Sequence, residues 1–257
     1  VDVFRSDDKF LPGKVAVGMA YVLVNTPRSD SRFKRYLSGY RRIADVTIDD
    51  VNETWGIYYY AQALHMLQKE GLLEQAISPA TLAKLRTRLD WRTFVRVDDL
   101  SLIDLPNNYI GVAFSVARLR YELGWEDASA SEALLQRTLS HYRRYSGEYG
   151  FADETDGKGR FDRYSVLLIG EISHRLIETD MPASDEVRAW LRKSVDLMLL
   201  RLNLRGEGFE YGRSIGAYGE TAFLEVLTAA AKLGVLSAEE LEMAYAYSSR
   251  VSARYMD

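Results

Sequence analysis

Helix ends recur along the sequence at nearly constant spacing, and this repeat limits the fold more than any other feature. In three places an apolar helical stretch is followed by Gly and then by a hydrophobic residue, at 69–72, 122–125 and 232–235. Glycine is suited to these positions because it adopts the left-handed conformation at low cost. The glycines are at 71, 124 and 234, so the gaps are 53 and 110 residues, and 110 is twice 55. The repeat predicts one more helix end, or stop, between 124 and 234. It is expected at 179–180, where Thr-Asp ends a helix at the same spacing.

Apolar spacing and end signals predict ten helices. Ser78 before Pro79, and Ser237 three residues before Glu240, are typical of helix N-termini, because the serine hydroxyl accepts from a free backbone N–H. No segment gives a convincing signal for a β-hairpin. The predicted helices lie at 14–25, 31–44, 55–70, 79–93, 109–123, 130–145, 164–178, 184–203, 218–233 and 238–254.

The helix starts repeat as well, at 55–58, 107–109, 162–164 and 216–218. A period of about 54 residues indicates an array of helical hairpins. The first helix of each hairpin is apolar nearly all round, as in 164–177. The second has its apolar residues along one face only, as in 184–203. A helix that is apolar on every side is buried on every side.

Alternating buried and half-exposed helices favour an inner ring of helices wrapped by an outer ring. The predicted fold is therefore all-α, an α/α toroid of helical hairpins in a single domain over residues 1–257. An open α-solenoid is the alternative, in which both helices of a pair would be evenly amphipathic. Five pairs are fewer than closed toroids commonly have, so we expect an incomplete ring, a five-pair ring or part of a longer protein.

Composition excludes several classes of function. The net charge of −4 is unlike that of a general nucleic-acid binder, and the absence of cysteine excludes thiolate metal sites, Fe–S clusters and cysteine nucleophiles. The three histidines are scattered, and no apolar run is long enough to span a membrane. We expect no metal, cofactor, nucleic acid or membrane partner. The chain begins with Val and shows no signal peptide, and we expect a secreted or periplasmic protein.

Functional residue types concentrate in the segments before the inner helices. These segments carry aromatic, Asn, Arg and acidic residues, whereas the outer turns do not. Aromatic rings stack on the C–H faces of sugars, and the polar groups bind hydroxyls, so a carbohydrate site is predicted at one mouth of the ring. Tyrosines that merely seal the ring mouth are the alternative. The segments are 55–60, 106–109, 153–164 and 206–218.

The motifs Asn107-Asn108-Tyr109, Arg160-Phe-Asp-Arg-Tyr164 and Tyr211-Gly-Arg213 through Tyr218 resemble those of toroidal polysaccharide lyases. The similar enzymes are the alginate-lyase and heparinase II/III-like group, and the resemblance covers residues 50–235 in architecture. It implies β-elimination on an acidic, uronate-containing polysaccharide or oligosaccharide. Such enzymes remove the C5 proton of a uronate and expel the C4 oxygen.

The resemblance also implies roles for individual residues. Asn108 or Asn107 would bind the uronate carboxylate, and Tyr164 or Tyr218 would transfer protons, with a pKa lowered by a nearby arginine. Arg163 and Arg213 would neutralise charge. The residues implied to bind substrate are Asn107, Tyr109, Trp55, Tyr58, Arg160, Tyr211 and Glu210.

Many such lyases have a histidine at the mouth, and this sequence lacks one at the expected place. We expect His174 and His65, well inside their helices, to be buried and structural, and His141 to be solvated on an outer helix. Two other functions stay open. A glycoside hydrolase, including the unsaturated-glucuronyl-hydrolase type, would use paired acids from the set Asp153, Asp156, Asp162, Glu171, Glu210 and Glu220. A non-catalytic helical-repeat scaffold would need no clustered polar residues. The acidic string 49–53 is a weak candidate for a metal motif.

Overall fold

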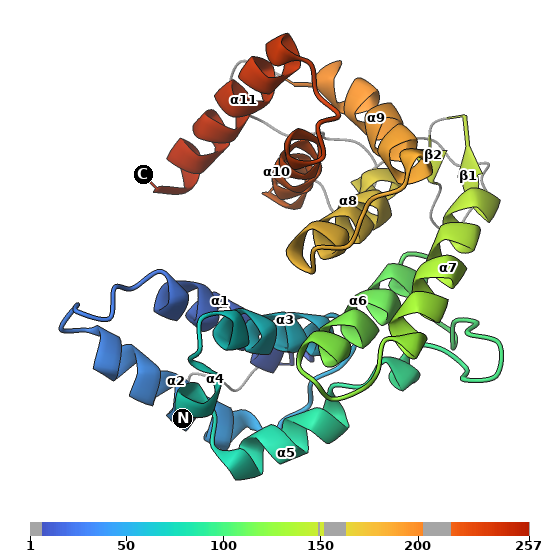
Figure 1. Cartoon of the computed structure of the whole chain (residues 1–257). Coiled ribbons are helices and arrows are strands. Elements are labelled where there is room, and N and C mark those ends of the chain that lie inside the picture. The colour runs from blue at the N-terminus through green and yellow to red at the C-terminus, as the bar shows by residue number, and fades with distance from the viewer. Residues whose placement is uncertain (1–6, 149, 152–162, 203–216, 257) are drawn as a thin grey trace. The chain divides into compact units, whose positions relative to one another are not determined.

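The protein is mostly helical in the computed structural model, which describes residues 7–148, 150–151, 163–202 and 217–256 (Figure 1). Within these ranges, no helix is both long and apolar enough to cross a membrane. The helices are α1 (Leu11–Val24), α2 (Phe33–Thr47), α3 (Trp55–Lys69), α4 (Leu73–Ala76), α5 (Pro79–Arg88), η2 (Trp91–Thr93), α6 (Tyr109–Glu122), α7 (Ser129–Arg144), α8 (Arg163–Glu178), α9 (Asp185–Leu199), α10 (Ala217–Lys232) and α11 (Ala238–Met256).

The chain forms two compact units. Unit 1 comprises Val1–Ile103 and Val112–Leu135, and unit 2 comprises Asp104–Gly111 and Gln136–Asp257. The first turn of α6 therefore belongs to unit 2 and the rest of that helix to unit 1.

The all-α prediction is confirmed, with small corrections to the elements. The helix expected over 79–93 ends at Arg88, because the Asp90 side chain accepts from the N–H of Arg92 and starts the separate 3₁₀ turn η2. The short helix α4 was not predicted. A small hairpin also corrects the expectation of none: β1 (Ser146–Gly147) pairs antiparallel with β2 (Gly150–Phe151). Its strands have two residues each, too few to show an alternating pattern.

All four predicted helix stops have the expected geometry. Gly71, Gly124 and Gly234 have φ of 65°, 69° and 67°. In each case the next residue donates to the carbonyl five positions back, as Leu72 does to Leu67 at 2.8 Å. The fourth stop uses Asp180, with φ of 53°, and Met181 donates to Leu176 at 2.9 Å. The repeat is therefore real at the level of backbone conformation.

The fourth stop predicts a stabilising substitution. Asp180→Gly should raise the free energy of unfolding by about 0.5 kcal/mol, because glycine adopts positive φ without steric cost. Gly71→Ala should lower it by about 1 kcal/mol, since a Cβ there would meet no atom within 4 Å and only backbone strain changes. Urea denaturation measures both. A loss of stability in Asp180→Gly would contradict this account of the stop.

The two predicted serine caps are present. The Ser78 hydroxyl accepts from the N–H of Thr81 at 3.2 Å and starts α5, with Pro79 in the first turn. Ser237 and Glu240 form a reciprocal capping box at the start of α11. The Glu240 N–H donates to the Ser237 hydroxyl at 3.2 Å, and the Ser237 N–H donates to the Glu240 carboxylate at 2.8 Å. These local signals fix where the helices begin.

Burial alternates along the chain as the sequence predicts. Helix α6 is buried on nearly all sides from Ile110 to Arg120, and the described part of α8 is similarly enclosed. Helices α5, α7, α9 and α11 each bury one stripe and expose the opposite face. Two classes of helix therefore succeed one another through both units.

Unit 1 is built on a close crossing of α1 and α3 (Figure 1). A Cβ on Gly13 would lie 2.0 Å from the carbonyl oxygen of Gly56, so glycine is required for this approach. Asn52 precedes α3, and its Oδ1 accepts from the N–H of Gly13 at 3.2 Å. In unit 2, α8 packs against both α9 and α10. The ring of Tyr142 stacks on Phe151 and Trp190, with centroids 5.4 and 4.3 Å apart.

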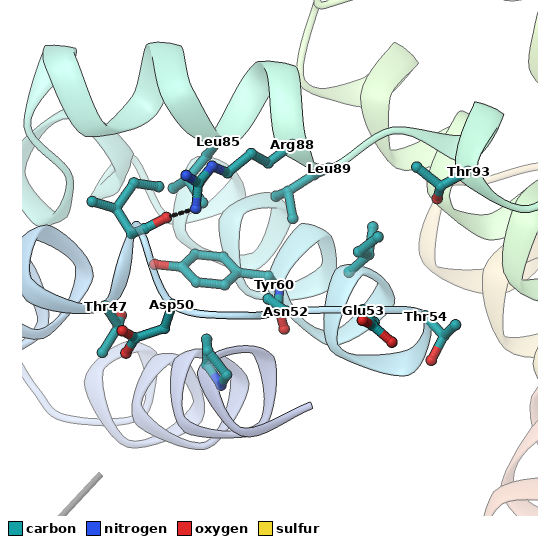
Figure 2. Close-up of a pocket in the computed structure, with 13 residues that line it drawn as sticks. Thr47, Asp50, Asn52, Glu53, Thr54, Tyr60, Leu85, Arg88, Leu89 and Thr93 are labelled. Carbon is teal, nitrogen blue, oxygen red and sulfur yellow. Dashed lines mark hydrogen bonds between the residues drawn. The ribbon is translucent and has the colours of Figure 1, made fainter. Parts of the chain in front are cut away.

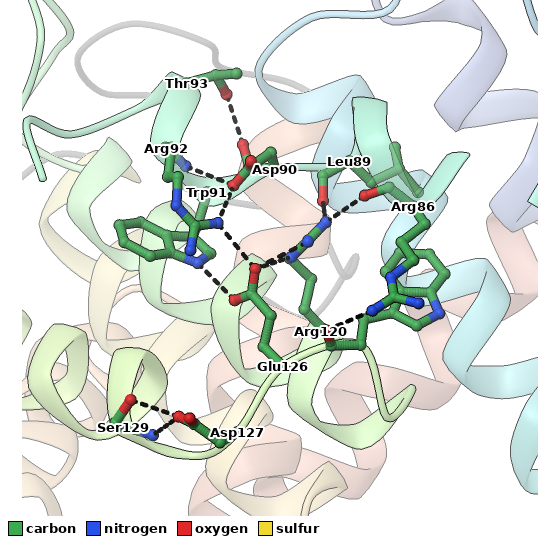
Figure 3. A network of polar contacts seen from close by, with 11 residues as sticks. Arg86, Leu89, Asp90, Trp91, Arg92, Thr93, Arg120, Glu126, Asp127 and Ser129 are labelled. Atoms are coloured by element: carbon green, nitrogen blue, oxygen red, sulfur yellow. Dashed lines mark hydrogen bonds and ion pairs between the residues drawn. The ribbon is translucent and has the colours of Figure 1, made fainter. Parts of the chain in front are cut away.

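A polar network joins η2 to the start of the α6–α7 connection within unit 1 (Figure 3). One Glu126 oxygen accepts from Arg92 at 2.8 Å and from Arg120 at 2.9 Å, and the other accepts from Trp91 Nε1 at 2.9 Å. Arg120 also donates to the backbone carbonyl of Leu89 at 2.6 Å. Burial alone would raise the pKa of Glu126, but the hydrogen bonds from Arg92, Trp91 and Arg120 outweigh it and hold that pKa below its usual range.

Candidate functional site

The residues predicted to form the site fall into three groups. Trp55 and Tyr58 belong to unit 1, and Asn107, Asn108 and Tyr109 belong to unit 2. The third group is not described at the level of side chains. Seven of these residues lie outside the described ranges: Arg160, Glu210, Tyr211, Arg213, Asp153, Asp156 and Asp162. The backbone of the other three is described, with Arg163 and Tyr164 at the start of α8 and Tyr218 second in α10, but their side chains are not.

Asn107, Asn108 and Tyr109 form the turn that begins α6. The backbone N–H of Tyr109 donates to Pro106 at 3.0 Å, and that of Gly111 donates to Asn108 at 3.2 Å. Asn108 is 2% exposed, and its side-chain Oδ1 accepts no hydrogen bond. Leaving a buried amide oxygen unbonded is costly. A buried amide whose oxygen has no hydrogen-bond partner among the described residues therefore lies at the N-terminus of a buried helix.

Glu171 on α8 lies beside this turn. Its carboxyl is buried, with the residue 2% exposed. A Cβ on Gly111 would lie 2.8 Å from Glu171 Oε2 and 2.5 Å from Leu168 Cδ1. The absence of a side chain at Gly111 thus lets α8 bring a carboxyl group against the backbone of the first turn of α6. Sequence analysis identified Glu171 as an acid on a buried helix face, and its burial is confirmed.

His141 was expected to be solvated, and this prediction is wrong. Its ring is buried, and Nε2 has no hydrogen-bond partner. Desolvation lowers the pKa of His141 to about 4, helped by Arg137 and Arg144, while the backbone of Asn107 acts in the opposite direction. The imidazole is therefore neutral at pH 7 and lies near the turn that begins α6.

A sequence signal for the burial of His141 did exist. Leu134, Thr138 and His141 are spaced at i, i+4 and i+7 on α7, and all three are buried. The Thr138 hydroxyl donates to the carbonyl of Ile110 at 3.3 Å, so this stripe faces the first turn of α6. The other histidines differ. His65 is buried as predicted, but His174 is only half-buried, and this corrects the expectation of an enclosed ring.

The burial of His141 predicts a pH-dependent stability. Between pH 6.5 and about 4 the unfolded chain binds a proton that the folded protein does not, so stability should fall as the pH is lowered. The loss should reach at most about 3 kcal/mol. His141→Asn should remove this part of the dependence, measured as the difference between wild-type and variant unfolding free energies. Parallel curves for the two proteins over this range would contradict a buried neutral ring.

Trp55 and Tyr58 are brought together in the first turn of α3. Their ring centroids are 5.5 Å apart with planes at 84°, and Tyr59 joins them at 6.0 Å from Trp55. All three side chains are partly exposed. Such a cluster offers edges and faces on which a sugar ring can stack. The pairing of Trp55 with Tyr58 that the site prediction needs is thus present in unit 1.

Two acidic groups considered as catalytic candidates are engaged in other contacts. Glu220 is buried and accepts from Arg254 at 2.8 Å and from the Tyr255 hydroxyl at 2.9 Å. In the string 49–53, Asp49 pairs with Lys84 at 3.0 Å. Among the described residues, no group of three His, Cys, Asp or Glu side chains is arranged to hold a metal ion.

No model of a known protein family matches this sequence, and no curated protein matches it either. The assignment of a function therefore depends on the residues and geometry described above.

Proposed function

We propose that the protein cleaves an acidic, uronate-containing polysaccharide by β-elimination. The observation that carries the proposal is the burial of the Asn108 side chain at the start of α6, the helix whose Gly111 lies against the buried carboxyl of Glu171. The amide N–H groups of an asparagine donate to a carboxylate. Hydrogen bonds to the uronate carboxylate would stabilise the negative charge that spreads into this group when C5 loses its proton.

In this reaction a base removes the C5 proton, and the electron pair of that bond forms the C4–C5 double bond. The C4–oxygen bond breaks, and the leaving oxygen takes a proton from an acid. We assign the proton transfers to Tyr164 or Tyr218, and charge neutralisation to Arg163 and Arg213. Water is not consumed, which separates this reaction from hydrolysis.

We further propose that the helical hairpins close around a common axis as an α/α toroid. Two observations support this arrangement: the four helix stops at near-constant spacing and the alternation of buried with half-exposed helices. In a toroid, the segments that begin α3, α6, α8 and α10 share one mouth. The aromatic cluster of Trp55 and Tyr58 would then form a stacking platform for the sugar chain. Asn107, Tyr109, Arg160, Glu210 and Tyr211 would complete the substrate contacts.

Glycoside hydrolysis is the second candidate, and the buried Glu171 favours it. A buried carboxyl group can act as a general acid in glycoside hydrolysis. The same mouth would then cleave by adding water, with a second acid as partner.

The activity test uses a panel of uronate polymers and follows the ultraviolet absorbance of the new C4–C5 double bond. We expect absorbance to rise with at least one polymer. Tyr164→Phe or Tyr218→Phe should abolish the rise with an unchanged melting temperature, because only a hydroxyl is lost. Tyr245→Phe, at a position that is 77% exposed on α11, is the matched control and should retain full activity. Release of reducing ends without any absorbance would favour the hydrolase.

A further inference from the structure

A pocket in unit 1 is lined by none of the residues assigned to the proposed lyase site. It has a volume of about 420 Å³ and lies between α5 and the segment that joins α2 to α3. Figure 2 shows Tyr60 between Arg88 on α5 and the segment that carries Asp50 and Asn52. The volume falls within the range of small-molecule sites, which is about 300–1,000 Å³.

One wall of the pocket is apolar. Ile57 on α3, Leu85 on α5 and Leu89 just after α5 line it, and all three side chains are buried. Tyr60 adds an aromatic ring and is 3% exposed. The hydrocarbon part of a ligand can pack against this wall and thereby lose its exposure to water.

The charged side chain at the pocket that is not held in an ion pair is a carboxylate. Among the described residues, the exposed Asp50 carboxylate has no ion-pair partner, and Glu53 pairs with Lys9 at 3.0 Å across an exposed contact. The Arg88 guanidinium, by contrast, is already bonded to the Ile48 carbonyl and to Asp49, the latter at 2.9 Å. A ligand in the pocket would therefore meet the unpaired carboxylate of Asp50, whereas Arg88, the cation among the described lining residues, is already bonded.

Thr54 gives a second indication that the pocket wall is specialised. Its backbone has φ of 40°, a conformation that is strained for a β-branched residue. Its hydroxyl is buried without a hydrogen-bond partner, although the residue lines the pocket. Strain and an unbonded hydroxyl at one position both cost stability, and a ligand that bonds this hydroxyl would recover part of that cost.

We propose that this pocket binds a small organic cation, with a protonated amine at Asp50 and an apolar body against Ile57, Leu85 and Leu89. A uronate chain does not fit this chemistry, because its carboxylates would face Asp50 and Glu53. The pocket is therefore a binding site distinct from the proposed lyase site, and its test does not depend on catalysis.

The test is equilibrium binding to the intact chain, measured by calorimetry at low ionic strength with three probes of one shape. Benzylammonium carries a positive charge, benzyl alcohol is neutral and benzoate is negative. We expect benzylammonium to bind most tightly, benzyl alcohol at least about fivefold more weakly, and benzoate not at all, because charge-assisted hydrogen bonds are the stronger ones. Added salt should weaken only the binding of benzylammonium.

Asp50→Asn should weaken benzylammonium binding about fivefold and leave benzyl alcohol unaffected. Asp98→Asn is the matched control, because Asp98 is also exposed in unit 1 but does not line the pocket. It makes the same change in net charge and should leave binding unchanged. Equal weakening by both variants, equal affinity for benzoate, or no binding of benzylammonium would overturn the proposal.

Discussion

Asn108→Ala should reduce the rate of β-elimination by about 10²–10³-fold, the loss typical of removing one donor that stabilises developing negative charge. The side chain is 2% exposed, and its amide oxygen has no partner within the protein. The substitution therefore breaks no hydrogen bond to that oxygen among the described residues. We expect the melting temperature to stay near that of the wild type while the turnover number falls.

Asn107→Ala is the internal control for this prediction. Asn107 is adjacent but only half-buried, and we expect a loss of less than about tenfold, as for a residue that contributes to binding alone. Initial rates of ultraviolet absorbance on the best polymer give both values. The assignment of the carboxylate to Asn108 is wrong if the two variants lose the same activity, or if Asn108→Ala loses none.

Glu126→Gln should lower the free energy of unfolding by about 3 kcal/mol, because it removes one partner of a largely buried ion pair and leaves the other charge uncompensated. Arg120 is 6% exposed and pairs with Glu126 at 2.8 Å. Glutamine preserves the size of the side chain, so the loss reports on charge. Arg92 is more exposed, and its share of the effect should be small.

The matched control for the network is Glu132→Gln on α7. Glu132 is exposed and has no ion-pair partner within the part of the chain that the structure describes, so its replacement should change stability by less than about 0.5 kcal/mol. Chemical denaturation at pH 7 measures both variants. The stability of the wild type should also decline as the pH falls through the lowered pKa of Glu126, and Glu126→Gln should lose that contribution. Equal stability of the two variants would contradict the network's role.

Sequence predicted those features of the fold that depend on local chemistry. Helix stops at Gly71, Gly124 and Gly234 follow from the left-handed conformation of glycine, and the repeat alone located the fourth stop at Asp180. Serine caps also depend only on neighbouring residues. The hairpin around Gly150 was missed because two-residue strands carry no periodicity.

The candidate site was less predictable, because burial of a polar side chain depends on which helices face it. His141 shares a buried stripe with Leu134 and Thr138, but a histidine in an amphipathic helix reads from sequence as polar. The close approach of Glu171 to Gly111 is likewise a property of two helices that are distant in sequence. The contact between Trp55 and Tyr58 follows from their spacing, since residues three apart in a helix lie on one face.

The most direct test of β-elimination is the mass of the oligosaccharides released from a uronate polymer of known composition. Elimination predicts that each new non-reducing end carries an unsaturated uronate, so the product is lighter by one water than the corresponding saturated oligosaccharide. Asn108→Ala should release far less of this product. If the products have the mass of fully hydrated oligosaccharides, the protein adds water across the bond, and the proposed lyase chemistry is wrong.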